Sequence, residues 1–263
     1  MPLANNRTFV ISLLLIAVFL LAGLVFWSYT YQEKGVLPPD TTDSFVLGQY
    51  YFNYGDRADG TYDLAKARRY FDKALEANPA GNSLAWYQLG RIDFLEGYFD
   101  DASYKFGKQL DYFGDSVPNV YYMLGLTYAY RAKNFGVESD WQKAEENFAK
   151  FLALQEDSPW ARVDLAWVYF SQGKYEGMLP LLEQGLLIAE SNPWLLNMYG
   201  LALLNTGDKS GAKEAFTKAK VQVEALTVED WGKSYPGNDP GVWERGLSEF
   251  RTAIEKNLSL ASF

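Results

Sequence analysis

The side chains of this protein that could do chemistry are carboxylates, lysines, arginines and hydroxyl groups, because its 263 residues include no histidine and no cysteine. Zinc sites of the usual Cys/His type, cysteine nucleophiles, Ser-His-Asp triads, disulfide bonds and haem ligation by His or Cys are therefore excluded. Asp56, Asp59 and Asp63 lack the spacing of a calcium-binding loop, and no glycine-rich phosphate-binding loop occurs. We predict a protein that is not an enzyme and has no catalytic residues, no metal and no cofactor.

The net charge and the aromatic content of the chain limit the classes of partner that the protein is expected to bind. The chain has 24 Lys and Arg against 33 Asp and Glu, a net charge of -9, and a pI near 4.7. Proteins that bind nucleic acid usually present a basic surface, so no nucleic acid is expected. The 8 Trp, 19 Tyr and 17 Phe make up 17% of the chain, and they must lie in a core, at an interface or in a groove.

The first element that could position the rest of the chain is an apolar segment at its start. Residues 8–32 carry no charge, and residues 9–27 are almost wholly Leu, Ile, Val, Phe and Ala. As a helix the segment would span about 37 Å, which exceeds the hydrocarbon core of about 30 Å. Trp27, Tyr29 and Tyr31 stand where an interfacial aromatic belt belongs. We predict a single transmembrane helix at 8–32 that binds the lipid bilayer.

The flanks of this segment predict its orientation. Arg7 precedes it and acidic residues follow it, so the positive-inside rule places a short cytoplasmic tail at 1–7 and the rest of the chain outside the cytoplasm. Residues 33–40, with two prolines, would form a stiff linker. The predicted location is the bacterial inner membrane, with the soluble part periplasmic or extracellular. A cleavable signal peptide fits less well, because the apolar run continues through Val25-Phe26-Trp27 where small residues are expected.

An internal repeat accounts for the rest of the chain. Trp86, Leu89 and Gly90 are followed by Ala102 and Phe106, and the same frame recurs four more times between residues 41 and 226. This spacing, W-x2-L-G followed by A-x3-F, resembles that of the tetratricopeptide repeat (TPR) family. The resemblance implies an all-α, right-handed solenoid of five helix-turn-helix repeats at 41–81, 83–116, 118–158, 159–192 and 193–226.

Local signals support these repeat limits. Small residues such as Gly90 and Ala102 allow the two helices of a repeat to approach closely. Asn-Pro or Ser-Pro pairs separate successive helices at 78–79, 158–159 and 192–193, since proline suits the first turn of a helix. The first and third repeats each have seven extra residues, around 56–63 and 133–139, which we expect between their helices.

The C-terminal region, 227–263, is predicted to be a turn-rich linker followed by a capping helix. Val242, Leu247 and Phe250 begin an apolar series at helical spacing that ends at Leu258. A solenoid needs a helix with a polar outer face at its end. The alternative is that this helix folds into the groove of the array as an internal ligand.

The resemblance to TPR proteins also implies a binding groove, because the first helix of each repeat lines the concave face. In this register the groove is aromatic and rich in amides, and Arg91 is its only cation. TPR domains that hold the C-terminal carboxylate of heat-shock chaperones instead use several Lys, Arg and Asn residues there. The predicted partner-binding residues are Phe45, Gln49, Phe52, Tyr87, Arg91, Phe94, Asn119, Tyr122, Tyr130, Trp160, Trp167, Phe170, Trp194 and Asn197.

An apolar groove of this kind suits an extended or helical segment of another protein. Trp160, Trp167 and Tyr130 are the strongest candidates for contact, and the opposing interpretation is that neighbouring repeats or the C-terminal helix cover the groove. We predict a membrane-anchored interaction scaffold that assists an envelope assembly, translocation or maturation complex. Two alternatives stay open: a glycan-binding or glycan-assembly accessory protein, and a cytosol-facing protein similar to import receptors.

Overall fold

The computed structural model describes residues 40–52, 62–78, 80, 84–235 and 238–262. The predicted tail at 1–7, the transmembrane helix at 8–32, the linker up to residue 39 and most of the first insertion lie outside these residues. Within the part of the chain that is described, every helix is too short or too polar to cross a membrane.

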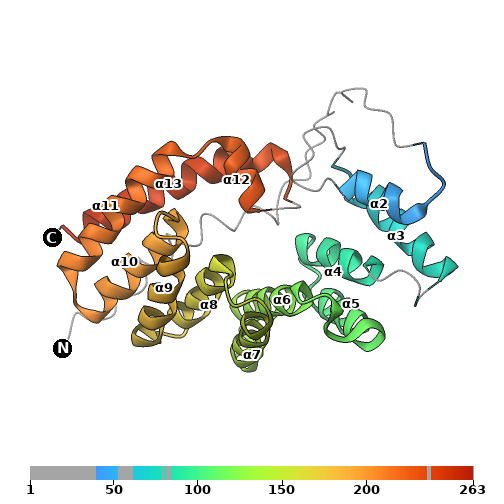
Figure 1. Ribbon diagram of the computed structural model, residues 1–263, viewed down its shortest axis with the longest axis horizontal. Helices are drawn as coiled ribbons and strands as arrows, with labels where there is room; N and C mark the ends of the chain where they lie inside the picture. The colour runs from blue at the N-terminus through green and yellow to red at the C-terminus, as the bar shows by residue number, and fades with distance from the viewer. Residues whose placement is uncertain (1–39, 53–61, 79, 81–83, 236–237, 263) are drawn as a thin grey trace.

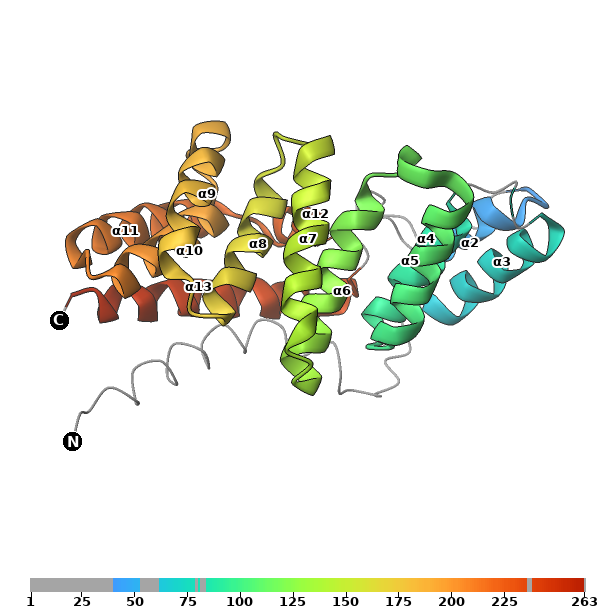
Figure 2. The ribbon, with the colours of Figure 1, turned by 90° about the horizontal axis from the view of Figure 1, so that it is seen from below.

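The described residues form twelve α-helices and no β-strand. Ten of the helices make five consecutive pairs, and the pairs follow one another along an arc (Figure 1). Figure 2 shows the same order from below. The pairs are α2 (Ser44–Phe52) with α3 (Leu64–Ala77), α4 (Ala85–Leu95) with α5 (Phe99–Phe113), α6 (Asn119–Phe135) with α7 (Ser139–Leu154), α8 (Pro159–Ser171) with α9 (Tyr175–Ile188), and α10 (Pro193–Thr206) with α11 (Lys209–Ala225).

A glycine on the first helix faces a phenylalanine ring on the second helix in four of the five pairs. A Cβ added at Gly90 would lie 2.6 Å from Phe106, which is closer than a side chain can approach. The glycine therefore lets the ring fill the space between the two helices, and Phe106 is completely buried. The other three contacts of this type are Gly48 with Phe71, Gly125 with Phe148 and Gly200 with Phe216.

The Ser-Pro and Asn-Pro pairs begin helices as their residue types dictate. Ser158 accepts a hydrogen bond from the Ala161 N–H at the start of α8. Asn192 accepts two, from the N–H groups of Trp194 and Leu195, at the start of α10. Each cap satisfies backbone donors that have no partner inside the helix. In the first Asn-Pro dipeptide, Asn78 follows the last residue of α3, and Pro79 lies outside the described residues.

The third pair differs from the expectation that its extra residues lie between the helices. Helix α6 continues to Phe135, and only residues 136–138 separate it from α7. Gly136 ends the helix in a left-handed conformation with φ of 67°, which glycine adopts without strain. Residues 133–135 of the expected insertion therefore lengthen α6, since the sequence up to Gly136 contains no residue that stops a helix, and residues 136–138 lie between the helices as expected.

The C-terminal region contains a helix that the sequence analysis did not predict. Helix α12 (Val228–Ser234) forms within the expected linker, and a capping box between Thr227 and Asp230 fixes its start. A short 3-10 turn (Pro240–Val242) and the long helix α13 (Trp243–Leu260) follow. Helix α13 packs chiefly against α11. In Figure 1 the arc is open at the top, and α13 and α12 run along that open side from the α11 end.

Candidate interaction surface

The residues of the predicted groove differ in how far they are buried in the structure. Seven remain partly or fully exposed, and the other seven are buried by neighbouring helices or by the C-terminal region. The partly or fully exposed residues are Phe45, Gln49, Phe94, Asn119, Tyr122, Tyr130 and Trp160, and the buried ones are Phe52, Tyr87, Arg91, Trp167, Phe170, Trp194 and Asn197.

At the N-terminal end of the array, the predicted residues mainly serve packing. Phe52 has no exposed surface, and Phe71 packs against both Phe52 and Phe45. The Arg91 guanidinium lies over the Phe52 ring, 4.6 Å from its centroid, and donates a hydrogen bond to Gln88. The single cation of the predicted groove is thus engaged in the joint between the first and second pairs.

The middle of the array brings together a group of side chains that we call the central cluster: Tyr122 and Tyr130 on α6, Asp164 and Trp167 on α8, and Tyr235 after α12. The Tyr122 hydroxyl donates to Asp164 Oδ2 at 2.5 Å. The rings of Tyr130 and Trp167 lie 5.3 Å apart. Tyr122, Tyr130, Asp164 and Tyr235 all keep some exposed surface. Two of the three strongest predicted contact residues therefore meet here.

Asp164 is the acidic residue of the central cluster, and its charge affects the pKa of the neighbouring tyrosines. Burial raises the pKa of its carboxyl group to about 6, against the opposing effect of the hydrogen bond from Tyr122. Burial and the nearby carboxylate together raise the pKa of Tyr122, Tyr130 and Tyr235 above the usual range. The three phenols therefore stay protonated at all physiological pH values.

Residues of the C-terminal region cover the end of the predicted groove near α10. Trp194 donates a hydrogen bond from Nε1 to the Tyr235 hydroxyl at 2.8 Å and stacks on Phe250, with ring centroids 5.1 Å apart. Asn257 donates to Asn197 at 2.9 Å. Trp160 contacts Trp194 edge-on at 5.0 Å but remains partly exposed. Trp194 and Asn197 are thus held by the chain itself.

Two residues of the central cluster, Asp164 and Tyr235, were not predicted from the sequence. Asp164 is the only carboxylate in the apolar helix α8, which was a usable signal. Tyr235 lies in a segment that resembles a linker, and no periodic pattern marks it. Only the path of α12 places it beside Trp194 and Asp164.

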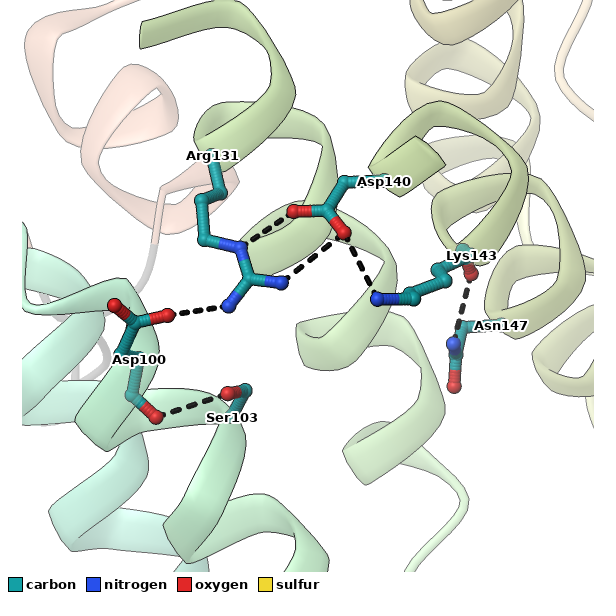
Figure 3. A network of polar contacts seen from close by, with 6 residues as sticks. All are labelled: Asp100, Ser103, Arg131, Asp140, Lys143 and Asn147. Carbon is teal, nitrogen blue, oxygen red and sulfur yellow. Dashed lines mark hydrogen bonds and ion pairs between the residues drawn. The ribbon is translucent and has the colours of Figure 1, made fainter. Parts of the chain in front are cut away.

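Ion pairs between residues outside the central cluster join helices of the same pair and of neighbouring pairs. Arg131 on α6 binds Asp100 on α5 and Asp140 on α7, and Lys143 binds Asp140 from the next turn (Figure 3). Burial alone would raise the pKa of Asp140, but hydrogen bonds from Arg131 and Lys143 hold it below its usual range. A similar junction joins buried Asp93 on α4 to Arg68 on α3 and Lys105 on α5.

Comparisons with known proteins agree with this architecture. Residues 195–220 match the model of the tetratricopeptide repeat family. The crystal structure of MamA is similar, with 25% sequence identity, a TM-score of 0.53, and coverage of 62% of this chain and 90% of that one. PilW, a widely conserved type IV pilus biogenesis factor, has 18% identity and a TM-score of 0.54 over 84% of this chain and 97% of its own.

A thermophilic TPR protein from Thermus thermophilus is similar over 62% of this chain and 84% of its own, with 17% identity and a TM-score of 0.51. A search of curated proteins gave no match. Identities at this level establish the fold. The chain therefore contains a match to the tetratricopeptide repeat at 195–220, within an all-helical solenoid of the TPR type.

Proposed function

We propose that this protein is a non-enzymatic scaffold that binds a segment of another protein on the inner surface of its array. The observation that supports this most directly is the partly exposed aromatic surface of Tyr122, Tyr130 and Trp160 on α6 and α8. Aromatic side chains on rigid helices lose little entropy on binding and dominate the energetics of interfaces. Burial of such surface contributes about 25 cal/mol per Å² before the costs of association.

The covered residues limit where a partner binds. Trp194 and Asn197 already contact Tyr235 and Asn257, and Phe52 is buried within the first pairs. Apart from Phe45 and Gln49 on α2, the accessible residues of the predicted groove lie in its middle, from the partly exposed Phe94 to Trp160. A short extended segment or one or two helical turns would fit this length better than a long helix.

We further propose that residues 8–32 anchor the protein in the bacterial inner membrane, with the array on the periplasmic or outer side. The support is the uncharged length of this segment and the position of Arg7. Such a scaffold would act in an envelope assembly, translocation or maturation complex. PilW is a pilus biogenesis factor, but at 18% identity it supports only the choice of fold.

Site-specific photo-crosslinking in cells tests the binding surface. A photoreactive phenylalanine analogue replaces Trp160, and in a matched control it replaces Tyr104, which is 60% exposed on α5. We expect a discrete crosslinked partner protein from position 160 and none from position 104. The Tyr130→Ala variant should remove that crosslink while the protein still unfolds cooperatively. The absence of any crosslink from position 160 would contradict the proposal.

Protease protection on intact spheroplasts tests the orientation. An array outside the cytoplasm should be digested without lysis, while a cytoplasmic control protein survives. If the array is degraded only after lysis, the proposed orientation is wrong and the cytosol-facing alternative is favoured.

A further inference from the structure

Asp164 stands out because its negative charge has no cationic partner among the described residues. Its only hydrogen bond to them comes from the Tyr122 hydroxyl, and no ion pair reaches it. Asp93 and Asp140, two carboxylates with buried side chains, each bind two cations. A partly buried carboxylate that only a phenol satisfies is unfavourable for folding. Its presence at the inner surface therefore suggests a role in binding.

Among the described residues, Tyr122 donates a hydrogen bond to Asp164, and the carboxylate interacts electrostatically with the phenols of Tyr130 and Tyr235. Tyr122 and Tyr130 lie on α6, Trp167 lies one turn further along α8, and Tyr235 follows α12. Aromatic faces attract cations because their π-electrons form a negative surface. The cluster already shows this preference: Lys133 lies 5.8 Å from the Tyr130 ring centroid and 5.5 Å from that of Trp167.

Lys133 does not neutralise Asp164. No ion pair between them is present in the described structure, and only burial, with no contribution from a carboxylate, lowers the pKa of Lys133. Arg91, the cation of the predicted groove, lies over Phe52 and Tyr87 at the N-terminal end of the array. Among the described residues, the charge of Asp164 is thus not matched by a cation.

We propose that Asp164, Tyr122, Tyr130 and Tyr235 form a subsite that receives one lysine or arginine side chain of the bound partner segment. The carboxylate would pair with the cationic group, and the tyrosine rings would pack on its aliphatic stem and its charge. This inference rests on the proposed binding of a partner segment to the inner surface. It adds that the segment carries a basic residue among apolar ones, which also complements a protein with a net charge of -9.

A random peptide array probed with the purified full chain in detergent micelles tests the subsite. We expect Lys or Arg at one position in most peptides that the wild type binds. A bound peptide is then titrated against its copy with norleucine in place of that residue, which keeps the stem and removes the charge. The wild type should bind the lysine peptide about tenfold more tightly, as expected for one charge pair next to aromatic rings.

Substitutions of Asp164 separate charge from shape. Asp164→Asn keeps an acceptor for the Tyr122 hydroxyl and should lower the tenfold preference to less than about twofold. Asp164→Glu restores the charge and should recover part of the preference. Asp101→Asn, at an exposed position on α5, is the matched control and should leave the preference unchanged.

The outcomes distinguish this inference from the proposed function. If the wild type binds peptides without a basic preference, or if Asp164→Asn retains the preference, the subsite is wrong. Loss of this binding on Trp160→Ala would still support the inner surface as the binding site. If no peptide binds any form of the protein, both the subsite and the proposed peptide binding are overturned.

Discussion

Asp140 lies in the first turn of α7, and Asp164 lies in the middle of α8, the next helix of the chain. The two carboxylates differ in burial and in the groups that bind them. Asp140 has no exposed surface and binds Arg131 through two hydrogen bonds of 2.5 and 3.0 Å, with Lys143 as a second cation (Figure 3). Asp164 is partly exposed and, among the described residues, receives one hydrogen bond, from Tyr122. The pKa of the first carboxyl is lowered, while that of the second is raised.

One carboxylate is paired with cations of the chain, and the other is the residue on which the proposed subsite depends. The charge of Asp140 is matched by Arg131 and Lys143, and Arg131 also binds Asp100, so these ion pairs join α5, α6 and α7. The charge of Asp164 has no cationic partner among the described residues, and in the proposed subsite a basic side chain of the ligand would pair with it. Four substitutions, in order of expected effect, test this contrast.

Arg131→Ala should have the largest effect. It removes both ion pairs that join α6 to Asp100 and Asp140, and it leaves the buried Asp140 with Lys143 alone. Breaking a buried pair from one side typically costs about 3–5 kcal/mol, and we expect about 3 kcal/mol because the side chains of Arg131 and Asp100 are 20% and 85% exposed. Urea denaturation at pH 7 measures the decrease in the free energy of unfolding. A decrease below about 1 kcal/mol would mean that these ion pairs are not needed for stability.

Tyr122→Phe should lower the free energy of unfolding by about 2 kcal/mol at pH 7, because Asp164 then loses its hydrogen bond while charged. At pH 4 the carboxyl group is protonated, so the loss should be smaller. Chemical denaturation at both pH values measures the difference. The same substitution made in an Asp164→Asn background should show a weaker pH dependence, and an equal pH dependence in both backgrounds would refute the coupling.

Asp164→Asn should stabilise the protein. The folded-state pKa of Asp164 is raised from 3.8 to about 6. A raised carboxyl pKa favours folding below pH 4, and that advantage is lost as the pH rises through 6. A shift of about 2 units corresponds to about 3 kcal/mol, which we discount to about 1–2 kcal/mol because the side chain keeps solvent contact.

The measurement is the difference in unfolding free energy between Asp164→Asn and wild type from pH 4 to pH 8. It should be near zero at pH 4, increase through pH 6 and level off above pH 7. A variant that is less stable than wild type at pH 7 would show that Asp164 stabilises the fold, as Asp140 does, and the contrast between the two carboxylates would disappear.

Lys143→Ala should have the smallest effect, at most about 0.5 kcal/mol. Its side chain is 47% exposed, and exposed ion pairs contribute little. Comparing the thermal unfolding of Lys143→Ala with that of Arg131→Ala measures how much each cation that binds Asp140 contributes to stability. A loss above about 1.5 kcal/mol would indicate that the carboxylate depends on both cations equally.

The prediction of an all-helical solenoid of the TPR type is confirmed. It succeeded because each pair repeats the same local contact, such as Gly90 against Phe106, and because prolines and caps mark the helix ends within the sequence. These signals act over a few turns of chain, so the sequence shows them directly. The transmembrane helix, the repeat limits, the location and the partner-binding role of the groove residues stay predictions.

The central cluster could be predicted only in part. Tyr122, Tyr130 and Trp167 follow from the register of the repeat. Asp164 is not among the groove positions of that register, and Tyr235 lies in a segment that was predicted to be a linker. The extra residues of the third repeat were expected between its helices, but residues 133–135 lengthen α6 and only residues 136–138 lie between α6 and α7. In the cluster, the deciding contacts join residues far apart in the chain.

The amino-acid sequence by itself determined the class of this protein: no His or Cys for the commonest catalytic and metal chemistry, and a repeated helix pair whose apolar faces require stacking. Tertiary structure decided which aromatic residues stay accessible and which the chain covers for itself. It also decided that Asp140 is neutralised by Arg131, while Asp164 has no cation beside it in the described part of the chain. The physical reason is that burial and ion pairing depend on distances between separate helices, which the curvature of the array and the path of α12 set.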